Sequence, residues 1–130
     1  MTVTIYVPRD SGALALGAEK VAARIAGEIK TRGLDAKIVR NGSRGLYWLE
    51  PMVEVETPAG RTAYGPVAAK DVPSLFDAGF LSGGKHELSL GDPEKIPYLA
   101  RQTRLTFARV GVTDPVSVDD YKAHGGLAGL

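Results

Sequence analysis

Residues 41–56 read NGSRGLYWLEPMVEVE and connect the first part of the chain to the rest through a polar loop and a strand. The loop carries two glycines, Arg44 and the only tryptophan of the chain. Pro51 predicts the start of the strand, because its fixed φ and missing N–H suit a first strand position. The loop has two interpretations, a hydrophobic plug between two strands or a binding site held by a rigid scaffold.

The composition is that of one globular domain: 130 residues, 44% of them hydrophobic and 24% charged. A net charge of +1, from 16 basic and 15 acidic residues, gives no electrostatic case for nucleic acid or an anionic membrane as partner. The chain has no cysteine, which excludes disulfides and any iron–sulfur cluster held by its own thiolates. With no apolar run of membrane-spanning length, we expect a cytoplasmic protein.

Periodicity predicts a strand, a helix and a second strand before the loop. Apolar residues alternate over residues 2–7, and apolar residues repeat at spacings of three and four over residues 13–32. Gly33 is a natural end for this helix. Residues 36–40 form a second strand, which a right-handed return over the helix makes parallel to the first.

After the loop, residues 52–57 and 61–67 flank Pro58-Ala59-Gly60 and predict a hairpin. A second helix is predicted within residues 67–81, beginning near Pro73. The order strand–helix–strand–hairpin–helix is that of a thioredoxin-like α/β domain over residues 1–82, followed by an irregular C-terminal extension. The predicted core residues are Leu14, Val21, Ile25, Val53, Leu75 and Phe76.

The extension is predicted to begin with a linker, residues 83–103, in which polar residues and turn signals predominate. Residues 104–110 are interpreted as a final strand. A short helix is predicted to start at Ser117 and to end at Gly125-Gly126.

No motif in the chain supports catalysis. His86 and His124 lie in separate polar segments without spaced metal-ligand partners. No glycine run has the spacing of a dinucleotide-binding or phosphate-binding loop. Glu50 is expected to have a raised pKa if it is buried.

The loop resembles the second cluster-binding loop of thioredoxin-like 2Fe–2S ferredoxins, which reads G-C-x-G-x-C-x-x-x-P before an alternating strand. Gly42, Gly45 and Pro51 match this motif. The resemblance implies that Ser43 and Tyr47 occupy two cysteine positions, and that Pro8 and Ala13 occupy the two cysteine positions that precede the first helix. It therefore implies a scaffold that has kept its fold and lost all four cluster ligands.

The C-terminal residues resemble the opening of NADH-binding flavoprotein (diaphorase) subunits. The matching segments are RQTRL at 101–105, GVTDP at 111–115, VDDY at 118–121 and GGLAGL at 125–130. Such subunits occur in respiratory complex I, NAD-reducing hydrogenases and soluble NAD-dependent formate dehydrogenases. A cluster-free thioredoxin-like domain ahead of this segment is similar to the beta subunit of the formate dehydrogenases, and the hydrogenase diaphorase is the alternative.

This second resemblance implies that residues 104–130 are the truncated start of an FMN- and NADH-binding domain. It implies FMN, a 4Fe–4S cluster and NAD for the full subunit, and no cofactor or metal in this segment. The implied partners are the other subunits of a formate dehydrogenase complex, including a 2Fe–2S thioredoxin-like subunit.

The sequence hypothesis is thus a non-catalytic docking module. Arg44 and Trp48 are predicted to form an exposed or subunit-facing patch, while Tyr47 is predicted to be buried where the cluster would lie. The alternative is a stand-alone thioredoxin-like protein that binds a small ligand or serves as an adaptor.

Overall fold

The computed structural model describes residues 1–130 and is built around a five-stranded sheet in the order β2-β1-β3-β4-β5. β1 and β2 are parallel, and the other neighbours are antiparallel. The strands are β1 (Val3–Tyr6), β2 (Ala36–Val39), β3 (Val53–Thr57), β4 (Gly60–Tyr64) and β5 (Ser89–Gly91).

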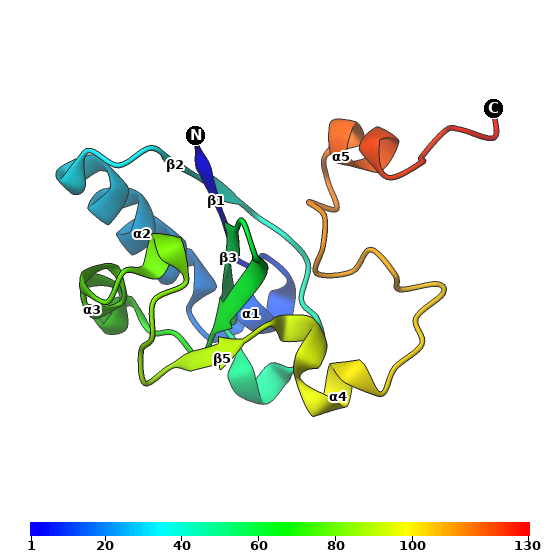
Figure 1. The fold of residues 1–130 in the computed structure, drawn as a ribbon. Coiled ribbons are helices and arrows are strands. Elements are labelled where there is room, and N and C mark those ends of the chain that lie inside the picture. The colour runs from blue at the N-terminus through cyan, green and yellow to red at the C-terminus, as the bar shows by residue number, and fades with distance from the viewer.

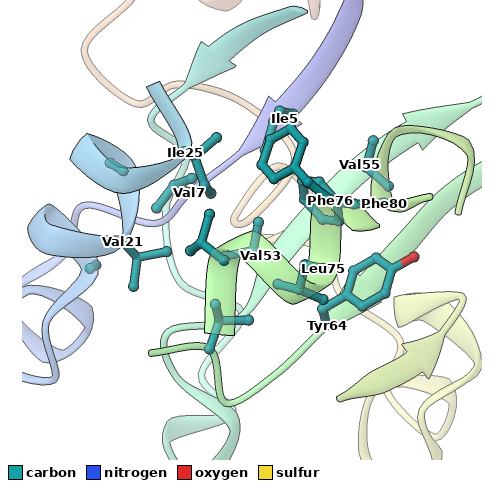
Figure 2. Close-up of a cluster of buried hydrophobic side chains, with 14 of the residues drawn as sticks. Ile5, Val7, Val21, Ile25, Val53, Val55, Tyr64, Leu75, Phe76 and Phe80 are labelled. Atoms are coloured by element: carbon teal, nitrogen blue, oxygen red, sulfur yellow. The ribbon is translucent and has the colours of Figure 1, made fainter. Parts of the chain in front are cut away.

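One face of the sheet is covered by the helices α1 (Ser11–Ala15), α2 (Ala18–Arg32) and α3 (Val72–Asp77). Figure 1 shows α2 and α3 on one side of the strands, whereas the chain after α4 runs along the other side. The helices and the sheet enclose a cluster of 15 buried residues, part of which is shown in Figure 2. Of the predicted core residues, it contains Val21, Ile25, Val53, Leu75 and Phe76.

The predicted helix over residues 13–32 is divided into α1 and α2. Gly17, which adopts φ +99°, separates them, and this left-handed conformation cannot continue a helix. The prediction that Leu14 is a core residue is wrong: its side chain is 41% exposed. Because α1 is a separate turn, it buries Ala13 instead. α2 ends at Gly33 as predicted, and the Gly33 N–H bonds to the carbonyls of Ile29 and Lys30.

α3 is shorter than the predicted 67–81 segment and lies between two 3₁₀ turns, η2 (Ala69–Asp71) and η3 (Phe80–Ser82). The helix ends because Gly79 adopts φ +80°, after which η3 returns Phe80 to the core. Pro73 lies in the first turn of α3, as expected. β4 ends at Tyr64, three residues before the predicted end of its strand.

Residues 83–103, predicted as a linker, contribute β5, the 3₁₀ turn η4 (Pro93–Lys95) and α4 (Pro97–Ala100). β5 pairs with β4 at the edge of the sheet. A second small cluster of buried side chains contains Leu46, Met52, Ala63 and Leu99. The sheet and its packing thus extend past residue 82.

Residues 104–130, called the arm below, contain only the helix α5 (Val118–Ala123). α5 begins as predicted, because the hydroxyl oxygen of Ser117 accepts a hydrogen bond from the Asp120 N–H at 3.1 Å. The prediction of a strand over 104–110 is wrong. These residues form turns, and Leu105 and Phe107 are 91% and 66% exposed, because no strand edge lies beside them. No helix of the structure combines the length and the apolar character needed to cross a membrane.

Candidate functional site

The loop between β2 and β3 is anchored by its own apolar residue and its own turn. Leu46 is completely buried, and the 3₁₀ turn η1 (Tyr47–Leu49) follows it. Gly45 has φ +84°, and its N–H donates to the hydroxyl of Ser43 at 3.0 Å. The loop is therefore ordered by local contacts.

The four positions that the resemblance assigns to cysteines hold side chains of different kinds. Pro8 and Ala13 are buried, and Ser43 is half-buried and donates a hydrogen bond to Glu50 at 2.8 Å. Tyr47 is 61% exposed, so the prediction that it is buried is wrong. The physical reason is that the preceding residue, Leu46, already fills the interior, and the turn η1 leaves the Tyr47 ring outside.

The ring of Tyr47 nevertheless closes over the start of α1. A Cβ atom added to Gly12 would lie 3.1 Å from Tyr47 Cε1, so the ring rests against this glycine. Ser43, Tyr47 and Asp10 line one side of a cavity of about 420 Å³. The opposite wall comes from the arm: Arg109, Val110, Gly111, Thr113 and Pro115. Nowhere in the structure do three His, Cys, Asp or Glu side chains gather in a way that could hold a metal ion.

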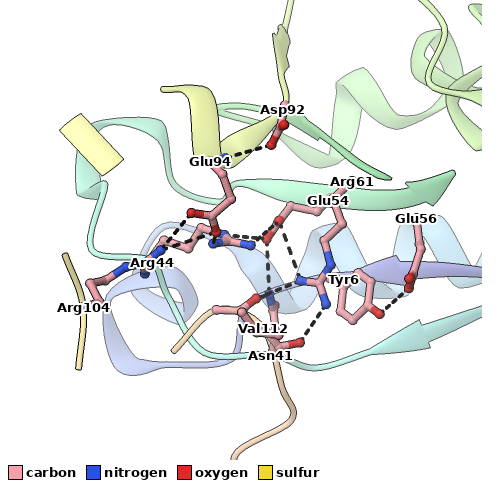
Figure 3. A network of polar contacts seen from close by, with 11 residues as sticks. Tyr6, Asn41, Arg44, Glu54, Glu56, Arg61, Asp92, Glu94, Arg104 and Val112 are labelled. Carbon is pink, nitrogen blue, oxygen red and sulfur yellow. Dashed lines mark hydrogen bonds and ion pairs between the residues drawn. The ribbon is translucent and has the colours of Figure 1, made fainter. Parts of the chain in front are cut away.

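The largest deviation from the sequence hypothesis is Arg44, whose side chain is only 3% exposed. It forms a two-point ion pair with Glu54 of β3, through Nη2 to Oε1 at 2.9 Å and Nε to Oε2 at 3.1 Å (Figure 3). The prediction of an exposed Arg44 is wrong because the Glu54 carboxylate, 1% exposed, requires a buried cation. Although burial by itself lowers the pKa of Arg44, its bonds to Glu54 and Glu94 raise that pKa above its ordinary value.

Three further side chains complete the surroundings of this pair. Arg44 Nη1 also bonds to Glu94 at 2.6 Å, and Arg104 lies 3.2 Å from the same carboxylate. Asn41, which is 2% exposed, donates to Glu54 at 3.4 Å. Arg44 of the loop, Glu54 of β3 and Glu94 of η4 thus belong to one polar network (Figure 3).

A second polar cluster lies on the same face of the sheet, where Tyr6, Glu56 and Arg61 meet. The Tyr6 hydroxyl donates to Glu56 at 2.6 Å, and the Arg61 guanidinium lies 3.5 Å from the centre of the Tyr6 ring. Burial is the largest cause, and the hydrogen bond to Glu56 the second largest, of a rise in the pKa of Tyr6 to about 12. Arg61 is also 3.7 Å from Glu54, so the two clusters are continuous.

The sequence analysis did not predict that Glu54 pairs with Arg44 or that Arg61 joins the polar network, although one signal was available. Glu54 and Glu56 alternate with buried valines on β3, and Arg61 pairs directly with Glu56 across the hairpin. Charged residues at alternate positions on two paired strands indicate a polar sheet face. What alternation does not reveal is that this face is covered by the arm.

Glu50 is buried, with 4% of its surface exposed, so the condition for the expected rise of its pKa is met. Burial raises the pKa of its carboxyl group above its ordinary value. Hydrogen bonds from the Met52 N–H and the Ser43 hydroxyl oppose this shift without cancelling it.

Exposed aromatic side chains lie beside the loop. Trp48 is 60% exposed, as predicted, and its ring makes an edge contact with Tyr98 of α4, with centroids 5.4 Å apart. Tyr98 is itself 54% exposed and was missed, because it lies in the segment predicted as a linker. We call Tyr47, Trp48 and Tyr98 the aromatic patch. The two histidines make other contacts: His86 contacts Ser74, and His124 contacts the Asp120 carbonyl.

Comparison with known proteins gives no matching family model and no matching curated protein. Among solved structures, the chain resembles the thioredoxin-like [2Fe-2S] ferredoxin from Aquifex aeolicus, with a TM-score of 0.59 and 22% identity over 70% of this chain and 98% of that chain. A cysteine-to-serine variant of that ferredoxin matches with a TM-score of 0.58 and 24% identity, over 69% and 99% of the two chains. Another structure of it matches at 0.59 and 19% identity, over 71% and 93%.

These likenesses show the fold of the chain, which is α/β and thioredoxin-like, as predicted. The ferredoxin is a 2Fe–2S protein, whereas this chain has no cysteine.

Proposed function

We propose that the chain is a cluster-free thioredoxin-like docking module in the flavoprotein subunit of a NAD-dependent formate dehydrogenase. The observation that carries the docking role is the aromatic patch beside the former ligand positions. The complete subunit would transfer electrons between iron–sulfur centres and NAD through FMN. This segment would hold subunits together and take no part in the chemistry.

The aromatic patch has the chemistry of an interface anchor. Its three side chains are each more than half exposed, and two of them contact each other edge to face. Tyrosine and tryptophan supply large apolar area with a polar tip, and such residues dominate the energetics of many interfaces. Tyr47 and Trp48 of the patch lie on the loop that resembles a cluster-binding loop of the ferredoxins, so a partner seated on the patch would contact this module beside the position of the cluster in those proteins.

The arm supports the assignment to a larger subunit. Eight of the fourteen exposed large apolar side chains lie within residues 104–130, where Gly111 alone is buried. An apolar surface of this kind favours packing against another folded body. The resemblance of residues 101–130 to flavoprotein subunits suggests that this body is the FMN- and NADH-binding domain.

The test is co-purification with the proposed partners. The tagged chain would be co-expressed with the 2Fe–2S thioredoxin-like subunit and the formate-oxidising subunit of a NAD-dependent formate dehydrogenase from the same organism. We expect a complex in size-exclusion chromatography. The double variant Trp48→Ala, Tyr98→Ala should weaken it by about 2 kcal/mol or more, because both anchors are lost.

The matched control is Leu16→Ala, which removes an exposed apolar side chain, 55% exposed, outside the aromatic patch. This variant should assemble like the wild type. Absence of a complex with formate dehydrogenase subunits, together with a stable complex with NAD-reducing hydrogenase subunits, would transfer the assignment to the hydrogenase diaphorase. A monomer in both experiments would overturn the docking role.

One observation favours the small-ligand alternative, namely the cavity of about 420 Å³ beside Ser43 and Tyr47. Its size is within the range of small-molecule sites. A ligand bound there would contact Asp10 and Arg109, whereas a partner seated on the aromatic patch would contact Trp48 and Tyr98. The small-ligand alternative would be favoured if Arg109→Ala abolishes binding of a small molecule to the chain while Trp48→Ala leaves that binding unchanged.

A further inference from the structure

The arm touches the sheet through a very short stretch. Residues 102–117 contain no helix or strand, and Gly111 is the only residue of the arm that is buried. The large apolar side chains on both sides of this glycine are exposed: Leu105, Phe107, Val110 and Val116. Apart from the ion pair of Arg104 with Glu94, the arm is therefore held mainly by polar contacts around one glycine.

These contacts are made to the main chain of the arm. Arg61 donates to the Gly111 carbonyl at 2.9 Å and to the Val112 carbonyl at 2.7 Å, so one guanidinium spans two successive peptide groups. Asn41 donates to the Gly111 carbonyl at 2.8 Å. Because no side chain of the arm takes part in these bonds, Arg61 and Asn41 recognise backbone. We call these two residues the carbonyl clamp.

The carbonyl clamp is itself held in place. The Arg61 guanidinium stacks on the face of the Tyr6 ring, and Asn41 also donates a hydrogen bond to Glu54 (Figure 3). A planar guanidinium stacked on an aromatic face keeps its donors in a fixed direction. The clamp therefore presents donors that are already oriented when a peptide arrives.

The position between the clamp and Arg44 admits only glycine. Gly111 adopts φ +81°, which a side chain disfavours, and a Cβ atom there would overlap Arg44 Cγ. Arg44 cannot easily move away, because Glu54 holds its guanidinium by two buried hydrogen bonds. The backbone of the arm thus passes directly over the buried ion pair.

We infer that the polar face of the sheet is a docking site for the main chain of a glycine-containing turn, and that residues 110–112 of this chain occupy it reversibly. The arm leaves the clamp as a unit while the sheet stays folded. Undocking removes the wall that Arg109, Val110 and Gly111 give to the cavity beside Ser43 and Tyr47, and it uncovers the Arg44–Glu54 pair. The state of the arm thus determines access to the former ligand loop.

Reversible docking follows from the kind of contacts involved. Regions with few buried apolar contacts and exposed backbone open locally at a lower free energy than the one that unfolds the core. The arm fits this description, whereas β3 has Val53 and Val55 completely buried. This inference does not depend on the identity of any partner subunit.

Hydrogen exchange of the full chain, followed by mass spectrometry, tests the inference. The Val112 and Thr113 amides bond to the Arg109 carbonyl in the turn that Asn41 and Arg61 hold. Release of the clamp should loosen this turn and speed the exchange of both amides. Gly111→Ala should speed exchange in residues 107–113 by about tenfold or more, with exchange in β3 unchanged. The matched control is Gly125→Ala: its φ of +84° is equally unfavourable for alanine, but its nearest neighbour atom is 3.8 Å away.

A second variant keeps the test valid if Gly111→Ala does not fold. Arg61→Lys retains the charge but cannot donate to two carbonyls through a rigid fork, and it should also accelerate arm exchange selectively. If residues 107–113 exchange no faster in Gly111→Ala and in Arg61→Lys than in Gly125→Ala, the glycine-specific docking site is wrong. Acceleration of the arm and β3 by the same factor would overturn independent undocking.

Discussion

Glu54 lies on a strand in the middle of the sheet with 1% of its surface exposed, and this carboxylate organises the polar face. A buried charge is tolerated only where opposite charge and hydrogen bonds compensate for lost hydration. Arg44 supplies two hydrogen bonds, Asn41 a third, and Arg61 lies 3.7 Å away. At the residue scale, the requirement of one carboxylate therefore explains why a loop arginine is buried.

Arg44→Met should lower the free energy of unfolding by about 3–5 kcal/mol, because it leaves the buried Glu54 carboxylate without its main partner. Urea denaturation measures the loss. Arg24→Met, which breaks an exposed ion pair with Glu28, is the control and should change stability by less than about 1 kcal/mol. If Arg44→Met costs no more than this control, Glu54 has enough compensation without Arg44.

Glu50 predicts a dependence of stability on pH. Burial raises the pKa of this carboxyl group in the folded state above its ordinary value of 4.5, so the folded chain holds this proton more tightly than the unfolded chain. Its contribution to stability is therefore greatest below pH 4.5 and is lost as the pH rises through the folded-state pKa.

The variant Glu50→Gln isolates this contribution. As the pH rises from 4.5, the free energy of unfolding of the wild type should fall relative to that of Glu50→Gln. Urea denaturation at a series of pH values gives the difference. A difference that stays constant, or that moves in favour of the wild type at higher pH, would show that the pKa of Glu50 is not raised by folding.

At the scale of elements, the break at Gly17 determines which apolar residues of the first helical region reach the core. Residues before the break form α1 and bury Ala13, while residues after it form α2 and bury Val21 and Ile25. A single continuous helix would have continued the apolar stripe through Leu14. Because two separate helices have independent orientations, the stripe does not extend across the glycine.

Ile25→Ala and Leu14→Ala form a pair that distinguishes these two arrangements. Ile25 is completely buried, so its truncation should cost about 2–5 kcal/mol of folding free energy. Leu14 is 41% exposed, and Leu14→Ala should change stability by less than about 0.5 kcal/mol. Similar losses in chemical denaturation for the two variants would support the continuous helix.

At the scale of the whole molecule, the fold is closed by chain that follows the strand–helix–strand–hairpin–helix unit. β5 covers the edge of β4, and α4 places Leu99 against Leu46 and Met52. The arm then crosses the polar face and contacts the carbonyl clamp. One face of the sheet is thus stabilised by an apolar core and the other mainly by ion pairs and a docked backbone.

Leu99→Ala tests whether the segment after residue 82 is part of the folding unit. Leu99 is 2% exposed, so the variant should lose about 2–5 kcal/mol in thermal or urea unfolding. Val116→Ala, in an arm position that is 70% exposed, is the control and should stay within about 0.5 kcal/mol of the wild type. A neutral Leu99→Ala would mean that this segment is a detachable linker.

The sequence by itself determined the features that depend on neighbouring residues. Alternation and helical spacing predicted β1, β2, the β3–β4 hairpin and α2, while Gly33 and Ser117 marked a helix end and a helix start correctly. These signals are local, because periodicity and caps act within a few residues. The order of these elements was enough to identify the thioredoxin-like fold, later shown by the structural likenesses.

Tertiary structure alone decided which loop side chains are buried and what covers the polar face. Arg44 is buried because Glu54 lies across from it, and Asn41 meets Gly111, 70 residues further along the chain. Tyr47 is exposed because Leu46 fills the interior, and β5 forms because β4 offers an edge. Burial of a charge, filling of a void and pairing at an edge each depend on a partner distant in sequence, and no local pattern specifies that partner.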